Sequence, residues 1–203
     1  MREETTCPRH TPWGGVQQQK QLFPGCWTVS TAGHGGFYVT RAVFEQMPEA
    51  LREKTCAGPQ WFEEDCDWAL VVVAFPQYFT PYEVYNAVRS VMEWNKEAWT
   101  VYGQTEAGKL LLDRANRFEQ DNGHKFSFGS MGTGGKGWAC SAYSLDRQTR
   151  VHFNCEDPWL LKSPFTLEEI QAIAEPGTFK SEPLPQKAPE TFSELLPAGM
   201  AKA

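Results

Sequence analysis

Alternating and clustered apolar positions predict three strands near the start of the chain. Residues 16–32 contain two such runs joined by Pro24–Gly25, a dipeptide that favours a turn, so a hairpin is expected there. Residues 36–39, Gly-Phe-Tyr-Val, predict a third short strand. The first half of the chain is therefore expected to contain antiparallel strands.

Capping signals and apolar stripes predict helices further along. The clearest helix begins at Thr80, where Pro81 suits the first turn and Glu83 completes a capping box. Its apolar stripe consists of Val84, Val88, Val91 and Met92. Other helices are expected from Thr40 to about Leu51 with an interruption at Pro48, over residues 105–122, and from Thr166.

A glycine-rich stretch follows the helix expected over residues 105–122. Its sequence, Gly-Ser-Met-Gly-Thr-Gly-Gly-Lys-Gly at residues 129–137, resembles a phosphate-binding P-loop only superficially. The glycine spacing is wrong, Gly137 replaces the Ser or Thr after the lysine, and a strand rather than a helix is expected next. We therefore expect a flexible surface loop.

Residues 138–155 predict a β-hairpin whose turn is formed by residues 146–149. If Leu145 stands opposite Arg150, Cys140 stands directly opposite Cys155. Directly opposed side chains lie near, but above, the spacing of a disulfide. In a reducing compartment the pair is expected to be two packed thiols.

Together these elements predict an α+β fold in which antiparallel strands and hairpins pack with three to four helices, followed by a flexible Pro-rich C-terminal tail. The predicted segments are a flexible arm over residues 1–10, an α+β unit over 11–95, a helix plus β-hairpin extension of the same globule over 96–174, and the tail over 175–203.

Charge and composition narrow the class of partner. The 203 residues carry a formal net charge of -6, which argues against a non-specific nucleic-acid partner. No apolar run approaches the roughly 18 residues of a membrane helix. The first residues also lack an apolar leader, so a cytoplasmic location without a membrane is expected. The six cysteines contain no Cys-x-x-Cys pair, and no cofactor is expected.

His34 is the first candidate for chemistry because glycines surround it. Gly33 precedes it, and Gly35 and Gly36 follow it at the start of an expected strand. Glycine permits unusual backbone shapes or the close approach of another group. The three glycines are therefore candidate binding residues around the imidazole.

Cys66 is the second candidate, within the acidic stretch Trp-Phe-Glu-Glu-Asp-Cys-Asp-Trp-Ala at residues 61–69. One interpretation is a packed thiol at the entrance to a buried element. Another is a nucleophile at a helix start, with His34 as its base and Asp65 in the catalytic set. That order is loosely similar to permuted papain-like hydrolases, whereas Cys66 with His152 would match the unpermuted order.

The same residues offer a metal site as a further alternative. His34 with Glu63, Glu64 or Asp65 would supply nitrogen and oxygen ligands that suit Zn or Mn. No local spacing such as His-x-x-x-His reinforces this alternative, and no metal is included in the favoured hypothesis.

Three motifs resemble an uncharacterised domain family of phages, plasmids and other bacterial mobile elements. They are Thr-Pro-Trp-Gly at residues 11–14, Ser-Thr-Ala-Gly-His-Gly-Gly at 30–36, and the acidic stretch at 61–69. The resemblance covers about residues 11–95 and implies an accessory protein that acts inside a bacterial host. Because it pairs His34 with the acidic stretch, we expect the two to lie within hydrogen-bond reach.

Two functions from different classes follow. The first is binding to a host or defence-system protein, since Trp and Tyr often anchor interfaces. Its candidate binding residues are Gly33, Gly35, Gly36, Trp61, Glu63, Glu64 and Trp68. The second is a cysteine hydrolase or transferase that uses Cys66 and His34.

Overall fold

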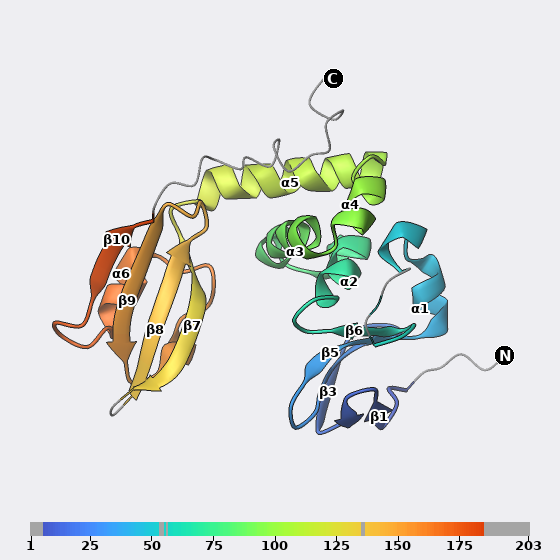
Figure 1. Cartoon of the computed structure of the whole chain (residues 1–203), viewed down its shortest axis with the longest axis horizontal. Coiled ribbons are helices and arrows are strands. Elements are labelled where there is room, and N and C mark those ends of the chain that lie inside the picture. The colour runs from blue at the N-terminus through green and yellow to red at the C-terminus, as the bar shows by residue number, and fades with distance from the viewer. Residues whose placement is uncertain (1–5, 53–54, 56, 135–136, 185–203) are drawn as a thin grey trace. The chain divides into compact units, whose positions relative to one another are not determined.

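The computed structural model describes residues 6–52, 55, 57–134 and 137–184, and Figure 1 shows the elements they form. Helices and antiparallel strands are mixed, which confirms the α+β class. The chain divides into two compact units, the first running to Ala115 and the second starting at Asn116. This boundary lies inside helix α5 (Glu106–Asn122), and the described residues after it belong to the second unit.

A four-stranded antiparallel sheet, in the order β3–β4–β5–β6, forms one layer of the first unit. Its strands are Gln18–Phe23, Cys26–Ser30, Gly35–Val39 and Trp61–Glu63. β3 and β4 form the hairpin predicted around Pro24–Gly25, and β5 is the predicted third strand. A short ribbon of β1 (His10–Thr11) and β2 (Gly14–Gly15) precedes the sheet.

Helices cover the inner face of this sheet, the face that carries Phe62. α2 (Trp68–Ala74) is the apolar run after the acidic stretch, and residues 69–73 are all buried, which explains why the run has no polar face. α3 (Pro81–Trp94) starts with the predicted capping box, and its predicted apolar stripe is buried. α4 (Lys96–Tyr102) follows and was not predicted.

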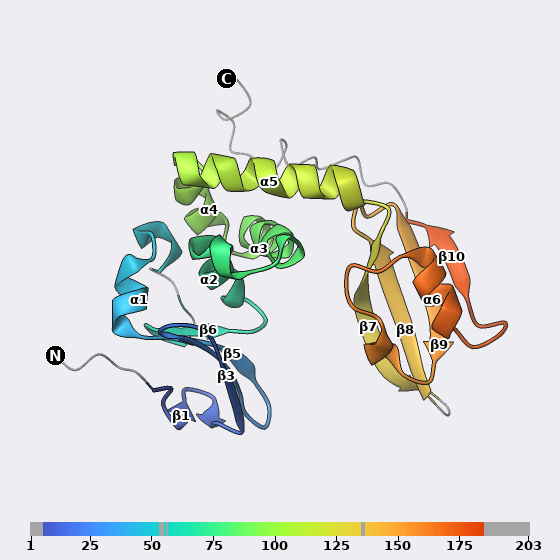
Figure 2. The ribbon, with the colours of Figure 1, turned by 180° about the vertical axis from the view of Figure 1, so that it is seen from behind.

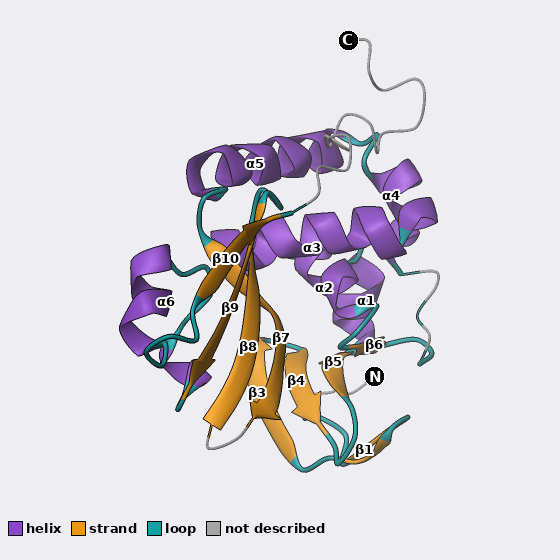
Figure 3. Cartoon of the chain, turned by 60° about the vertical axis from the view of Figure 1, so that its left-hand side comes forward, coloured by secondary structure: helices purple, strands orange, loops and turns teal. Residues whose placement is uncertain are grey.

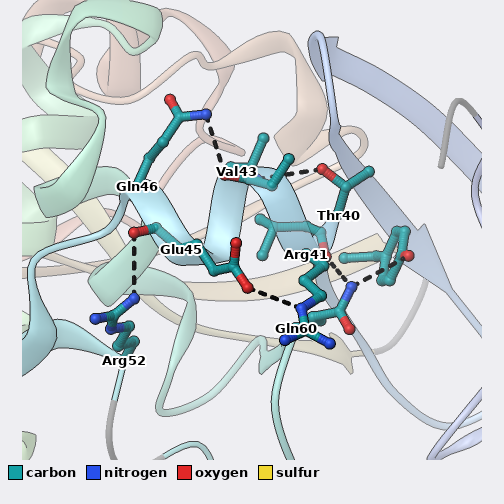
Figure 4. Close-up of polar contacts among 10 residues, drawn as sticks. Thr40, Arg41, Val43, Glu45, Gln46, Arg52 and Gln60 are labelled. Carbon is teal, nitrogen blue, oxygen red and sulfur yellow. Dashed lines mark hydrogen bonds and ion pairs between the residues drawn. The ribbon is translucent and has the colours of Figure 1, made fainter. Parts of the chain in front are cut away.

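The segment between β5 and β6 begins with helix α1 (Arg41–Gln46). The Thr40 hydroxyl accepts a hydrogen bond from the Val43 N–H, so Thr40 caps the helix as predicted (Figure 4). Pro48 ends the continuous helix, and Glu49–Leu51 adds only a single 3-10 turn.

The second unit contains a four-stranded antiparallel sheet in the order β10–β9–β8–β7. Its strands are β7 (Phe126–Gly134), β8 (Gly137–Ser144), β9 (Thr149–Cys155) and β10 (Lys180–Pro183). Helix α6 (Leu167–Ile173) starts at the predicted Thr166–Glu169 capping box and lies against one face of the sheet, as Figures 2 and 3 show. The residues buried between the helix and the sheet include Val151, Phe153, Phe165 and Ile170.

The glycine-rich stretch lies mostly in strands, so the predicted flexible loop is wrong. β7 runs to Gly134, β8 begins at Gly137, and these two residues are paired. Gly129 has a packing role, because a Cβ added there would lie 2.0 Å from the ring of Tyr143. Residues 135–136 of the stretch lie outside the described residues.

The β8–β9 hairpin differs from the predicted register by two residues, because Tyr143 stands opposite Arg150. The turn starts one residue earlier than expected. Leu145 is buried there, and the Ser144 hydroxyl accepts hydrogen bonds from the N–H groups of Gln148 and Thr149. A polar side chain that closes the turn therefore overrode the simple spacing argument.

This register places Cys140 opposite Phe153 and diagonal to Cys155, not directly opposite it as predicted. The two sulfur atoms still lie 3.8 Å apart, because residues two apart on a strand share one face. Both are free, buried thiols.

Part of the predicted tail belongs to the second sheet. β10 pairs antiparallel with β9, with Lys180 opposite His152, so the prediction of a tail from residue 175 is wrong for this segment. All four β10 side chains are exposed, and the strand is held by backbone pairing that leaves no apolar pattern in the sequence. Residues 185–203 lie outside the described residues.

Cysteine alkylation should separate the buried thiols from Cys66. Burial raises the pKa of Cys26 and of Cys140 to about 12 and also raises that of Cys155, so these thiols carry little thiolate near neutral pH. We expect iodoacetamide to modify the partly exposed Cys66 well before these three in native protein, as measured by peptide mass spectrometry. Denatured protein is the control, and rapid native labelling of Cys140 would contradict the buried pair.

Candidate functional site

A tight turn between β4 and β5 positions His34. The Thr31 N–H donates to the His34 carbonyl at 2.8 Å, and the Thr31 hydroxyl accepts from the His34 N–H at 3.2 Å. The backbone of the turn is therefore fixed, while the His34 side chain is 54% exposed. The imidazole is therefore held just before the first residue of β5 but remains accessible to solvent.

Gln60, the residue just before strand β6, is held against Val39 of β5 by two hydrogen bonds. The Val39 N–H donates to the Gln60 carbonyl at 2.9 Å. The Gln60 carboxamide in turn donates to the Val39 carbonyl at 3.1 Å, and Gln60 is labelled in Figure 4. Pairing then places Gly36 opposite Glu63. The side chain of Glu63 therefore lies beside that of His34, two residues before Gly36.

Two of the three glycines around His34 lie in close contact with other groups, and Gly36 meets backbone that cannot move aside. A Cβ at Gly35 would lie 2.3 Å from the Glu64 carboxylate. At Gly36, which has a φ of +150°, a Cβ would lie 2.1 Å from the Phe62 carbonyl oxygen and 2.9 Å from the Trp13 ring. Gly33 has no such neighbour within 4 Å. The glycines thus admit carboxylate, backbone and indole groups from this chain.

Glu63 is the centre of the candidate site. One carboxylate oxygen lies 3.4 Å from His34 Nδ1. The other accepts hydrogen bonds from the Asp65 N–H at 2.8 Å and the Cys66 thiol at 3.4 Å. Burial favours a higher pKa for this carboxyl, but the combined hydrogen bonds from Asp65, Cys66 and His34 lower the pKa below its ordinary value. Glu63 is therefore a fixed negative charge near neutral pH.

The proposed catalytic residues Cys66 and His34 both contact Glu63. The thiol donates to one carboxylate oxygen, and His34 Nδ1 lies against the other. A thiol that donates to a carboxylate is protonated, whereas the nucleophile of a cysteine hydrolase is the thiolate. Asp65 contributes its backbone N–H to Glu63. Cys66 also precedes Asp67, the N-cap of the short helix α2.

Three of these side chains lie close enough together to hold a divalent cation. One ligand atom from each of His34, Glu63 and Glu64 lies within 4.8 Å of the others. One nitrogen and two carboxylate ligands suit Zn or Mn. His34 and Glu64 are both exposed, and exposed acidic groups commonly occur without a metal. The arrangement can also accept hydrogen bonds or a positive charge from a partner.

An aromatic row borders the site on the outer face of the sheet. Trp27, Tyr38, Trp61 and Trp13 follow one another in it, with ring centroids 5.8, 4.7 and 5.9 Å apart. Of the two predicted tryptophans, Trp61 packs in this cluster, whereas Trp68 lies on α2 and is not among the described residues of the cluster. Trp13 was missed, although the Thr-Pro-Trp-Gly motif that contains it signalled its importance.

The first unit is thus an α+β domain with an acidic and aromatic surface site. The chain belongs to a family defined by a domain of unknown function, DUF7007, whose model matches residues 6–123. The match extends beyond residues 11–95 at both ends and includes α4 and α5. No curated protein and no solved structure matches the chain. Among the helices of the described residues, none has the length and apolar character needed to cross a membrane.

Alanine substitution at Gly36 and at Gly33 should affect stability to different extents. Gly36→Ala should lower the free energy of unfolding by roughly 1–3 kcal/mol, because its Cβ meets the Phe62 carbonyl in a strained backbone conformation. Gly33→Ala is the matched control, and its effect should stay within about 0.5 kcal/mol, as for ordinary surface positions. Urea unfolding measures both; equal losses would contradict the assigned contacts.

The stabilising effect of Glu63 should depend on pH. Because its pKa is lower in the folded state, ionised Glu63 stabilises the fold fully above the unfolded pKa of about 4.3. This stabilisation is lost as the pH falls through the lower folded value. Glu63→Gln should therefore reduce the free energy of unfolding by about 1 kcal/mol at pH 7, with the difference shrinking below pH 4.

Urea unfolding across this pH range checks the expectation. Glu49→Gln provides a control, because Glu49 is an exposed carboxylate on a different segment, the 3-10 turn after α1. A Glu63→Gln difference that stays constant from neutral to acidic pH would contradict the role of the charge.

Proposed function

We propose that this chain is a cytoplasmic accessory protein of a phage or other bacterial mobile element, and that it acts by binding a host or defence-system protein. The mobile-element setting is supported by the three motifs in residues 11–69. The mode of action is supported by one observation above all: the Cys66 thiol donates to one oxygen of the Glu63 carboxylate, and the His34 ring lies 3.4 Å from the other oxygen. That arrangement favours recognition over nucleophilic catalysis.

The proposed binding surface combines an apolar platform with a negative edge. Trp13 and Trp61 are half-buried, so each retains exposed ring area beside the carboxylates. Glu64 is exposed, and its carboxylate lies over Gly35 next to His34. Aromatic anchors next to charged groups are typical of residues that dominate binding energy. The chemistry suits a protein partner that presents a basic side chain.

A cysteine hydrolase or transferase is the second candidate, since Cys66 and His34 contact the same carboxylate. For catalysis, Glu63 would have to leave its present position so that the imidazole could accept the thiol proton. The two candidates make different demands on Cys66. A nucleophile has no substitute, whereas a thiol that only donates to Glu63 is expendable for binding.

Affinity capture from a bacterial lysate can separate the two candidates. We expect the wild-type chain to retain a specific protein, and His34→Ala with Glu64→Ala to lose it, because both exposed side chains belong to the proposed surface. Cys66→Ala should retain the partner. Glu45→Ala, which alters an exposed charge on α1, is the matched control for a nonspecific change in charge.

The captured protein should then bind the purified chain directly, as measured by calorimetry with the same variants. Retention by the His34/Glu64 double variant would contradict the proposed surface. Covalent capture through Cys66, lost in Cys66→Ala while the fold is unchanged, would establish the hydrolase or transferase alternative.

A further inference from the structure

The second unit has a polar sheet face on the side opposite α6. Side chains alternate across a strand, and Val151, Phe153 and Cys155 of β9 point into the core with α6. The intervening residues of β9, Arg150, His152 and Asn154, therefore lie on the other face. Within the described part of the second unit, α6 is the only α-helix after α5, and it packs on the opposite face.

Strand pairing brings polar residues of this face into rows. Ser130, Ser141, His152 and Lys180 stand opposite one another in turn across β7, β8, β9 and β10. The Ser130 and Ser141 hydroxyls are hydrogen bonded at 2.8 Å. The lysine end of the row is at the start of β10, where the chain arrives from Thr178.

A groove of about 450 Å³ opens at this end of the face. Its lining comprises Ala139, Cys140, His152, Phe153, Asn154, Gly177, Thr178 and Lys180. One wall is fixed by two hydrogen bonds of the Thr178 hydroxyl. It accepts from the Asn154 N–H at 3.1 Å and donates to the Glu175 carbonyl at 2.8 Å. The groove is thus a defined feature of the sheet edge.

The polar side chains of the groove are one lysine, Lys180, and the neutral hydrogen-bonding groups of Asn154 and Thr178, with His152 beside them. Among the described residues, no carboxylate forms an ion pair with Lys180. The side-chain amide of Asn154 likewise makes no hydrogen bond within the described chain. Glu182, the acidic neighbour on β10, pairs with Arg150 and lies 3.5 Å from His152 Nε2. Its charge is therefore largely offset by Arg150.

We propose that this groove binds an oxyanion, a phosphate or carboxylate group carried by a small molecule. Lys180 supplies the charge, and the Asn154 amide supplies a directional donor. The volume exceeds that of a bare phosphate and leaves room for an organic part beside Ala139. The groove lies outside residues 6–123, the part of the chain that the family match covers.

Inorganic phosphate and acetate are the probes for the test, each titrated at constant ionic strength into the full-length ¹⁵N-labelled chain. We expect saturable amide shifts that are concentrated at Ala139, Asn154, Thr178 and Lys180. Lys180→Gln should weaken the tighter of the two by about fivefold, the upper range for an exposed ion pair. Asn154→Ala should also weaken binding of that probe, because it removes the side-chain amide. The substitution keeps the hydrogen bond from the residue 154 N–H to the Thr178 hydroxyl, so the wall of the groove is retained.

Lys162→Gln is the matched control, because Lys162 is an exposed lysine of the same unit outside the groove. It should bind as the wild type does. The proposal is overturned if neither probe gives saturable shifts, if the shifts follow exposed lysines in general, or if Lys162→Gln weakens binding as much as Lys180→Gln. Dispersed amide spectra of each variant verify that the fold is retained.

Discussion

The close approach of β5 and β6 at Gly36 governs the geometry of the candidate site. Any side chain at residue 36 would collide with the Phe62 carbonyl, so only glycine lets the two strands pair there. Phe62 is buried completely on the inner face of the sheet. Since successive side chains of a strand point to opposite faces, burial of Phe62 places Glu63 on the outer face beside His34. The site thus depends on core packing one residue away.

The electrostatic character of the site follows from that placement. Glu63 has little exposure to solvent, so its charge is stabilised by donors of the protein: the Asp65 N–H, the Cys66 thiol and the His34 ring. Each of these donors is thereby committed to the carboxylate. A site organised around a fixed negative charge is pre-organised to recognise donors or cations, whereas a thiolate there would face repulsion. The same contacts that position the thiol therefore disfavour its use as a nucleophile.

Local signals in the sequence predicted much of this fold, and they failed where long-range pairing decides. The Thr80–Glu83 and Thr166–Glu169 boxes and the stripe of α3 were predictable because helix contacts are local. The motifs predicted that His34 lies near the acidic stretch. They did not predict the central role of Glu63, because that role depends on the β5–β6 register. Exposed β10 lacks any apolar pattern, and the Ser144 side chain set a turn that spacing alone misplaced.

The two units present sheet faces of opposite chemistry, and the formal net charge of -6 for the whole chain does not show this difference. In the first unit, Glu63 and Glu64 adjoin tryptophan rings and favour a cationic or donor-rich partner. In the second, Lys180 and the donors beside it favour an anion. Charged groups act mainly within a Debye length of about 8 Å at physiological ionic strength, so each face selects its ligand by local charge. The chemistry of each unit must therefore be judged from its own surface, because a net charge describes neither.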